Sequence, residues 1–130
     1  KALTKAGVLF IGDIAFLHDS NALLSSRTID QTLIIIILNN GGGTIFRMLP
    51  IDAFDKRYTQ LFETPQYVSI AALCRAHKIH HDLVSRPEQL LPAFEKRIEK
   101  PGVHVIECIT DPDESMAERR TLWGFTHSPD

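Results

Sequence analysis

An unbroken run of branched aliphatic residues constrains the fold of this chain more than any other feature. Leu33 to Leu38 contains four consecutive isoleucines, so an extended strand here would carry apolar side chains on both faces. Such a strand is typical of the centre of a parallel sheet with helices on both sides. Asn39-Asn40-Gly41-Gly42-Gly43 follows directly, and these residues tolerate the dihedral angles of a sharp turn. We therefore expect an inner strand that ends abruptly in a loop.

The remaining chain alternates between strand-like and helix-like patterns. Apolar runs predict three further strands, at Gly7–Ile11, Ile79–Val84 and Val103–Ile109. Apolar residues at helical spacing predict helices at Phe16–Leu24, Ile70–His77, Leu90–Ile98 and Asp113–Trp123. Strands that alternate with helices imply right-handed crossovers and a parallel sheet. The predicted fold class is α/β, with a parallel sheet flanked by helices on both faces.

Two local details are less regular. Ser85 and Glu88 match the spacing of a capping box, and Pro92 then lies where it would bend the following helix or force a later start. Residues 44–66 hold prolines and aromatic residues and predict a long connection.

Length and composition exclude several classes of protein. A chain of 130 residues fits one domain, and we interpret residues 1–130 as a single domain of a longer polypeptide. The net charge of −2, without a basic run, argues against binding to nucleic acid or a membrane surface. The longest apolar run is far shorter than the roughly 20 residues of a membrane span. Two cysteines and no signal peptide indicate a reducing cytoplasm.

The two most unusual loops, Gly12-Asp13 and Asn39 to Gly43, each follow an apolar strand. Ligands of parallel α/β sheets bind beyond the carboxyl ends of the strands, so both loops belong to one expected site. Asp13 offers a carboxylate and Asn40 an amide oxygen, which are suitable ligands for Mg²⁺ that is shared with a diphosphate. Either motif alone is an ordinary turn. Their combination at this spacing favours a diphosphate site.

Gly12-Asp13 and Asn39-Asn40 also resemble the signature of thiamine diphosphate (ThDP) enzymes, since Asp13 and Asn40 are 40 − 13 = 27 positions apart. The resemblance implies that Mg²⁺ or Mn²⁺ is held by Asp13, the side chain of Asn40 and the carbonyl of Gly42. It implies that ThDP is bound by Gly12, Asp13, Ile14, Ala15, Asn40, Gly42, Gly43, Ile45 and Phe46. Ile14 replaces a frequent glycine, and Ala15, in place of a frequent serine, offers only its backbone N–H.

Segments along nearly the whole chain are similar to the MenD family of menaquinone-pathway synthases. They are Gly12 to Leu23, Asn39 to Pro50, Leu61 to Pro65 and Val105 to Asp111, followed by Arg119-Arg120 and Leu122-Trp123. Glu63 replaces a usual glycine, and Gln66 replaces a frequent histidine. The resemblance implies decarboxylation of 2-oxoglutarate and addition of the resulting carbanion equivalent to isochorismate. Another ThDP enzyme, such as an acetolactate-synthase-like carboligase or a 2-oxoacid decarboxylase, is an alternative. A non-catalytic anion- or nucleotide-binding module is a second one.

Three residues after the glycine loop have expected roles in catalysis. In the family, large apolar side chains beneath the thiazolium hold the cofactor bent, and Ile45 and Phe46 match them; ordinary core burial is the alternative. Arg47 is a candidate for binding a substrate carboxylate, since arginine binds carboxylates bidentately, or is a plain surface arginine.

The resemblance also implies a partner. In this superfamily a glutamate from the pyrimidine-binding domain of a second subunit touches the cofactor, and no glutamate of this chain lies in a matching context. We therefore expect a homodimer or homotetramer, and no turnover by the chain alone.

Histidines elsewhere suggest other sites. His77, His80 and His81 with Cys74 could hold zinc, although their spacing does not resemble structural zinc sites. His18-Asp19 could relay protons, but adjacent helical residues point apart, which favours helix capping or support of the diphosphate site.

Overall fold

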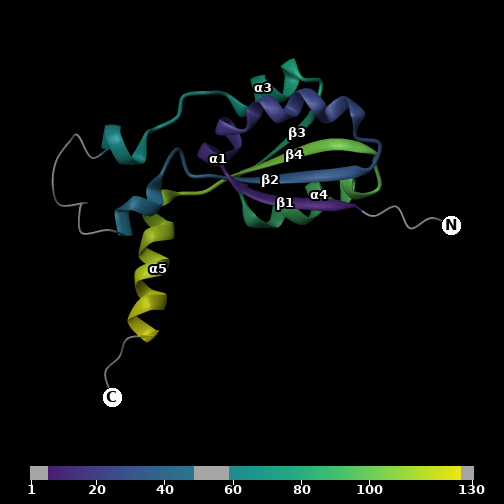
Figure 1. Cartoon of the computed structure of the whole chain (residues 1–130). Coiled ribbons are helices and arrows are strands. Elements are labelled where there is room, and N and C mark those ends of the chain that lie inside the picture. Colours follow the sequence, from purple (N-terminus) through teal and green to yellow (C-terminus); the bar gives the residue numbers. More distant parts are fainter. Residues whose placement is uncertain (1–5, 49–58, 127–130) are drawn as a thin grey trace.

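A computed structural model describes residues 6–48 and 59–126 of the chain. Within them, the strands form one parallel sheet in the order β1-β2-β4-β3 (Figure 1). The strand bounds are β1 Gly7–Gly12, β2 Thr32–Asn39, β3 His80–Val84 and β4 Gly102–Ile109. All four agree with the predicted strands to within a residue or two at each end.

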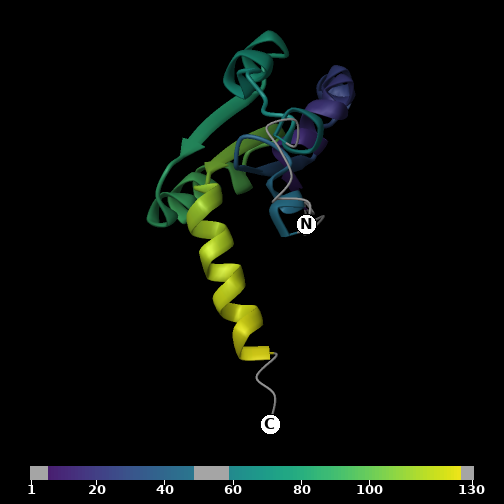
Figure 2. The same ribbon diagram turned by 90° about the vertical axis from the view of Figure 1, so that its left-hand side faces the viewer.

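Helices cover both faces of this sheet, which confirms the predicted fold class. Figure 1 shows α1 and α3 on one face and α4 on the other, whereas α5 extends away from the sheet in both Figure 1 and Figure 2. The α-helices are α1 Asp13–His18, α3 Ile70–Ala76, α4 Leu90–Ile98 and α5 Pro112–Thr126. Shorter turns are the 3₁₀ segments η1 Ser20–Thr28, η2 Thr44–Met48 and η5 Pro87–Gln89, and the π turn η4 Thr59–Glu63.

The isoleucine run behaves as its pattern predicts. Ile35 and Ile37 pack with residues of α1 and α3, and Ile34 and Ile36 pack on the opposite face with residues of α4. All four side chains are buried. Burial of each contributes roughly 1.5–3 kcal/mol, so β2 anchors the two halves of the core and fixes where its terminal loop begins.

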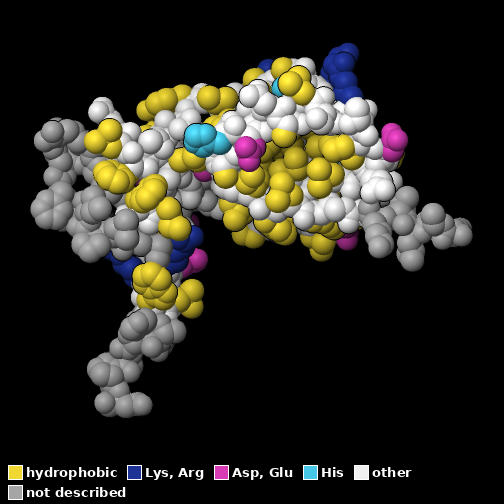
Figure 3. Space-filling model, in the orientation of Figure 1, with side chains coloured by type: hydrophobic (Ala, Val, Ile, Leu, Met, Phe, Trp, Pro, Cys, Tyr) yellow, Lys and Arg dark blue, Asp and Glu magenta, His cyan; other side chains and the backbone are white. Residues whose placement is uncertain are grey.

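The two edges of the sheet differ in chemistry. At one edge, β1 leaves Val8, Leu9 and Phe10 exposed, Phe10 by 64%. Figure 3 shows a broad group of hydrophobic side chains on this side of the molecule. At the other edge, β3 is short and carries histidines and an aspartate. Only the β1 edge is apolar on both faces of the sheet.

The helix predicted at Phe16–Leu24 is wrong in its bounds. Helix α1 begins directly at Asp13 and ends at His18, and the chain then continues as the 3₁₀ segment η1. The change of winding is visible in the hydrogen bonds, because the Asp19 N–H donates to the Ala15 carbonyl, whereas the Ala22 N–H donates to the nearer Asp19 carbonyl. Serines and asparagine in this stretch favour local bonds over a regular α-helix.

The predicted capping box before α4 is also wrong. Gln89, not Glu88, reaches back, and its Oε1 accepts hydrogen bonds from the backbone N–H groups of Ser85 at 2.9 Å and Arg86 at 3.1 Å. Because α4 starts at Leu90, Pro92 lies in the first helical turn, where its missing N–H is not needed. Helix α4 therefore has its predicted bounds, Leu90–Ile98, with Pro92 in a position that it can occupy.

Helix α5 starts one residue before the predicted bound and extends three residues beyond it. Asp111 caps it, since Oδ1 accepts from the N–H groups of Asp113 and Glu114.

The middle of the predicted connection, residues 49–58, lies outside the described residues, as do Leu49 and Pro50 of the second motif. None of the helices in the described parts of the chain is long and apolar enough to span a membrane.

Candidate functional site

The two loops that the sequence singles out lie at the same end of the sheet. In the register of β1 and β2, Gly12 pairs with Leu38. Asp13, the first residue of α1, and Asn39 therefore follow at the same level of two neighbouring strands. The predicted convergence at the carboxyl ends of the strands is present in the structure, and it follows from the parallel pairing of two buried strands.

Asp13 is buried, and its carboxylate is only half satisfied. Oδ1 accepts a hydrogen bond from the Ile14 N–H at 2.9 Å. Oδ2 is buried and has no hydrogen-bond partner among the described residues. A buried carboxylate oxygen without a partner is costly, so this atom suits a cation at the head of α1.

Asn40 shows the same half-satisfied state. Its Nδ2 donates to Thr44 Oγ1 at 2.6 Å, which assigns the two amide atoms, and Oδ1 is buried with no partner within the described ranges. Asp13 and Asn40 thus each present one orphaned oxygen. A carboxylate oxygen and an amide oxygen fit a hard divalent cation.

The glycine loop has a backbone that other residues would strain. Gly41 and Gly42 have φ values of +79° and +148°. A Cβ on Gly42 would overlap the Glu63 carbonyl, and the Gly43 N–H donates to that same carbonyl at 2.6 Å. The Gly42 carbonyl accepts from the Thr44 N–H at 2.9 Å, and a carbonyl oxygen has a second lone pair for another partner.

Ile45 and Phe46 follow the loop on η2, and both are exposed, Ile45 by 61%. Phe46 meets Phe62 edge to face, with ring centroids 5.7 Å apart. Ordinary core burial, the alternative explanation for these two residues, is therefore wrong. They present apolar side chains on the turn that directly follows the glycine loop.

Arg47 is held by two carboxylates and is not a plain surface arginine. Its Nε donates to Glu63, and its Nη1 donates to Asp113 at 2.6 Å. The hydrogen bond to Glu63, together with both negative charges, raises the pKa of Arg47 above its ordinary value. Glu63 is buried, whereas the side chain of Asp113 is 87% exposed. The arrangement ties η2 to η4 and α5 and leaves the Asp113 contact open to exchange.

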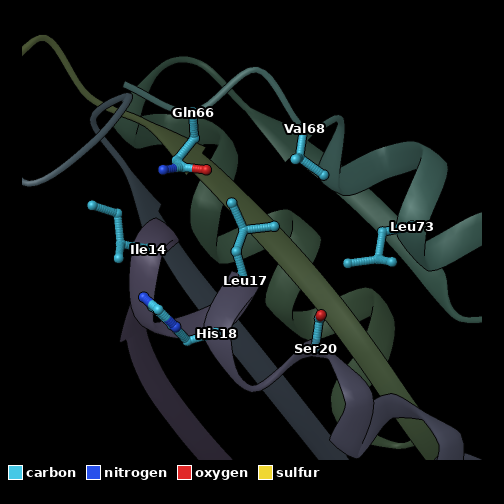
Figure 4. A pocket seen from close by; sticks show the side chains of 7 residues that line it. All are labelled: Ile14, Leu17, His18, Ser20, Gln66, Val68 and Leu73. Atoms are coloured by element: carbon cyan, nitrogen blue, oxygen red, sulfur yellow. The ribbon is translucent and has the colours of Figure 1, made fainter. Parts of the chain in front are cut away.

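A cavity of about 350 Å³ is lined in part by Ile14, the residue that follows Asp13. Figure 4 shows the side chains of its two walls, one from α1 and η1 and the other from the segment up to α3. They belong to Ile14, Leu17, His18, Ser20, Gln66, Val68 and Leu73. The Gln66 N–H donates to the Gly41 carbonyl at 3.4 Å, which joins this wall to the glycine loop. The cavity is mostly apolar, with His18 and Gln66 as its larger polar groups.

His18 and Asp19 separate in the structure. His18 lines the cavity, whereas Asp19 joins α1 to η1 and its side chain makes no capping hydrogen bond in the described segments. The predicted capping is wrong, and His18 is the member of the pair that lines the cavity.

The histidine-rich stretch does not form the alternative zinc site. His81 contacts Glu107 at 2.6 Å, and His80 stacks on His104 with centroids 5.7 Å apart. Burial raises the pKa of the Cys74 thiol to about 11. No cluster of three or more metal-binding side chains occurs in residues 6–48 and 59–126. These side chains serve the sheet and its core.

The motifs did not assign a role to three residues of the site: Thr44, Glu63 and Glu107. Thr44 orients Asn40, and Glu63 holds both Arg47 and Gly43. Glu107 accepts from Asn39 at 2.6 Å. Glu107 is signalled by the sequence as the one acidic residue inside the apolar strand β4, and Glu63 by its place in a motif that usually holds glycine.

Comparison with known proteins finds several relatives that share one name. The chain is similar to 2-succinyl-5-enolpyruvyl-6-hydroxy-3-cyclohexene-1-carboxylate synthases from Synechococcus sp. (strain JA-3-3Ab), with 40% identity over 89% of this chain, and from Halobacterium salinarum, with 35% identity over 86%. The synthase of Bacillus pumilus is 32% identical over 93%. This chain spans only 19–21% of the length of these relatives. The resemblance to the MenD family is confirmed.

Solved structures show the same fold. Benzoylformate decarboxylase from Polynucleobacter necessarius superposes with a TM-score of 0.70 at 16% identity, covering 84% of this chain and 20% of its own. The thiamine diphosphate-dependent 4-hydroxybenzoylformate decarboxylase of Rhodococcus jostii RHA1 superposes with a TM-score of 0.68 at 21% identity, covering 82% and 20%.

Residues 2–108 match the family described as "Thiamine pyrophosphate enzyme, C-terminal TPP binding domain", where TPP is another name for ThDP. The match includes both orphaned oxygens, the glycine loop and all four strands except the last residue of β4. The chain therefore belongs to the thiamine pyrophosphate enzymes, as a C-terminal TPP binding domain.

Proposed function

We propose that this chain is the ThDP- and Mg²⁺-binding domain of a MenD-type synthase, which decarboxylates 2-oxoglutarate and adds the product to isochorismate. The names of the relatives support the reaction, and their similarity extends over most of this chain. Because the chain spans about one fifth of their length, the activity is proposed for the complete protein.

One observation carries the metal part of the proposal. Asp13 Oδ2 and Asn40 Oδ1 are buried acceptors without partners among the described residues. They lie at the ends of adjacent strands, next to a glycine loop that a side chain would obstruct. Mg²⁺ bound by these oxygens and by the Gly42 carbonyl would satisfy them and offset the charge of a diphosphate. Mn²⁺ would fit the same ligands.

The residues around the cation have separate tasks in this proposal. Asp13 and Asn40 hold the metal, and Gly12, Ile14, Ala15 and Gly43 bring backbone groups close to the diphosphate. Ile45 and Phe46 supply an apolar surface that keeps water from the thiazolium and supports its bent conformation. When bound, ThDP supplies the nucleophilic carbon and accepts the electrons that are released with CO₂.

Arg47 is the proposed partner of a substrate carboxylate. Its guanidinium lies one residue beyond Phe46 and is anchored by the buried Glu63, while the exposed Asp113 occupies Nη1. A carboxylate of either anionic substrate could take the place of Asp113 without breaking the anchor.

The remaining part of the active site is proposed to come from a second subunit. Among the residues that the structure describes, no glutamate lines the cavity. We infer a homodimer or homotetramer in which a pyrimidine-binding domain supplies the missing carboxylate, so that the 130-residue chain alone does not turn over.

Both cysteines are free and buried, which suits a cytoplasmic protein.

The cofactor site is tested by equilibrium binding of ThDP to the complete protein across a Mg²⁺ titration. Asp13→Ala and Asn40→Ala should each weaken binding at least about 100-fold, because each removes a direct metal ligand. Asp30→Ala and Asn21→Ala, which change exposed residues of the same types, serve as matched controls and should bind normally. If the Asp13 and Asn40 variants bound ThDP as tightly as the wild-type protein, the assigned cofactor site would be wrong. Binding of another anion would then be the remaining function.

The reaction is tested with the complete protein, ThDP and Mg²⁺. Consumption of 2-oxoglutarate should depend on isochorismate, and the succinyl-cyclohexene adduct should be identified by mass. Consumption of a different 2-oxoacid would keep the cofactor assignment and replace the MenD reaction with that of another ThDP enzyme.

A further inference from the structure

We propose that Glu107 is a positioning residue that fixes the glycine loop through Asn39 and thereby sets the affinity of the cation site. Glu107 lies on β4, and the hydrogen bonds of its carboxylate go to Asn39 and His81, which are not proposed metal ligands. The inference rests on the proposed function, because it concerns the metal that Asp13 and Asn40 would hold.

A continuous set of hydrogen bonds leads from β4 to the loop. Glu107 Oε1 accepts from Asn39 Nδ2 at 2.6 Å, and Asn39 Oδ1 accepts from the Gly41 N–H at 3.0 Å. The backbone of Asn39 is also held, since its carbonyl accepts from the Thr110 N–H at 2.9 Å. Both ends of the Asn39 amide are therefore used, one to reach Glu107 and one to hold Gly41.

The second oxygen of Glu107 is engaged as well. Oε2 lies 2.6 Å from His81 Nε2 on β3, so a single carboxylate joins β3, β4 and the end of β2. Glu107 is only 7% exposed and faces Ile37 and Leu83 in the strand register. These contacts leave its carboxylate little rotational freedom.

Stability alone does not explain a carboxylate at this position. A buried charge loses hydration, and replacement of buried ionic groups with apolar residues is often neutral or stabilising. Of the other buried positions of β4, four are filled by valine, isoleucine or cysteine and one by His104, so the core mostly favours apolar residues here. The directional hydrogen bond to Asn39 is what glutamate adds and an aliphatic residue would lack.

The consequence falls on Asn40, which lies between the two residues that this network holds. Asn39 is fixed by Glu107, and Gly41 is fixed by Asn39 in a left-handed conformation with φ of +79°. Thr44 holds the Asn40 side chain. The orphaned Asn40 Oδ1 is thus placed before a cation arrives, and binding does not have to order the loop.

The test measures Mg²⁺ binding by calorimetry on the complete protein at saturating ThDP. Asn39→Ala and Glu107→Leu should each weaken Mg²⁺ binding by about 10- to 100-fold, the usual effect of losing a residue that orients a metal ligand. The double variant should bind no more weakly than Asn39→Ala alone, because both changes break one network. At saturating Mg²⁺, kcat should recover.

Two further variants separate positioning from general stability. Glu107→Gln keeps an acceptor for Asn39, and its amide N–H can donate to His81 Nε2 when the imidazole carries its proton on Nδ1, so the variant should retain Mg²⁺ binding. Thr32→Val removes the hydrogen bond to the Lys100 carbonyl at the opposite end of β2, and it should leave Mg²⁺ binding at the wild-type value. If Glu107→Leu does not fold, Asn39→Ala decides the question.

Normal Mg²⁺ affinity in Asn39→Ala would overturn the proposal, as would equal weakening in Thr32→Val. These results differ from a failure of the proposed function. In that case wild-type protein would bind no Mg²⁺ with ThDP, or Asp13→Ala would bind it normally, and the inference would fall together with the site.

Discussion

The amide nitrogen of Asn40 donates to Thr44 Oγ1 at 2.6 Å, and the amide oxygen is thereby left as a buried acceptor without a partner in the described residues. Thr44→Val keeps the shape of the side chain but removes this acceptor. We expect Mg²⁺-dependent ThDP binding to weaken about tenfold, because the Asn40 amide loses its fixed orientation. Calorimetry on the complete protein measures the effect, and Thr44→Ser, which restores the hydroxyl, should recover most of the affinity. Equal binding by the valine and threonine forms would contradict this role.

Gly42 and Gly41 should respond differently to alanine. Both have positive φ, but a Cβ on Gly42 would overlap the Glu63 carbonyl, whereas a Cβ on Gly41 would meet open space. We expect Gly41→Ala to cost about 1 kcal/mol, from the left-handed backbone alone. Gly42→Ala should cost more than about 2 kcal/mol, since strain and overlap add. Urea unfolding, followed by circular dichroism, measures the loss of unfolding free energy in each variant. Equal losses would show that the Glu63 carbonyl can move away from a Cβ on residue 42.

Asp82 should make part of the stability sensitive to acid. Burial alone would raise the pKa of its carboxyl, but the hydrogen bonds from Arg97 and Lys96 hold that pKa below its ordinary value. The unfolded chain therefore takes up a proton at a higher pH than the folded chain does. The stabilisation is complete above the ordinary aspartate pKa of about 3.9 and is lost as the pH falls through the folded value.

Asp82→Asn tests this dependence. The variant should lose about 1.5–3 kcal/mol of unfolding free energy near pH 7, because a charged acceptor of two cations is removed. As the pH falls below about 4, the unfolding free energies of the variant and the wild type should become equal. Urea unfolding at several pH values checks this, and a constant difference down to pH 2 would assign the effect to packing.

Asp113 should compete with substrate for Arg47 if Arg47 has its proposed role. Asp113→Asn removes an exposed carboxylate from Nη1 and leaves the buried anchor to Glu63 in place. Because an exposed ion pair contributes about 0.2–1 kcal/mol, KM for 2-oxoglutarate should fall by up to about fivefold. Steady-state kinetics of the complete protein measures it. If neither Asp113→Asn nor Arg47→Ala changed KM, Arg47 would not bind substrate. Its role would then be structural, joining η2, η4 and α5.

Much of the fold follows from the sequence because its strongest signals are those of burial. The isoleucine run requires apolar partners on both sides, and it obtains them from α1 and α3 on one face and α4 on the other. The helix predicted at Phe16–Leu24 was less certain physically, since α and 3₁₀ winding place apolar residues at similar spacing over a few residues. The backbone hydrogen bonds distinguish the two, as the bond from the Ala22 N–H to the Asp19 carbonyl shows, and periodicity does not report them.

The residues of the site also fall into two groups, those that the sequence signals and those that only the structure reveals. Asp13, Asn40 and Gly42 are recognisable because their chemistry and spacing are unusual, and the structure brings their loops together. Thr44 and Glu63 act through contacts that depend on how the chain turns after Gly43, and no local pattern encodes that turn. Glu107 was visible as a charge within an apolar strand, but its partner Asn39 lies 68 residues away along the chain.

The unequal edges of the sheet limit how copies of this chain can associate. Strands that add edge to edge need an accessible edge on each partner. The β3 edge carries His80, His81 and Asp82, whereas the β1 edge carries Val8, Leu9 and Phe10. Within the described residues, the β1 edge is therefore the one where a further strand or another chain would bury apolar surface, and the β3 edge is not.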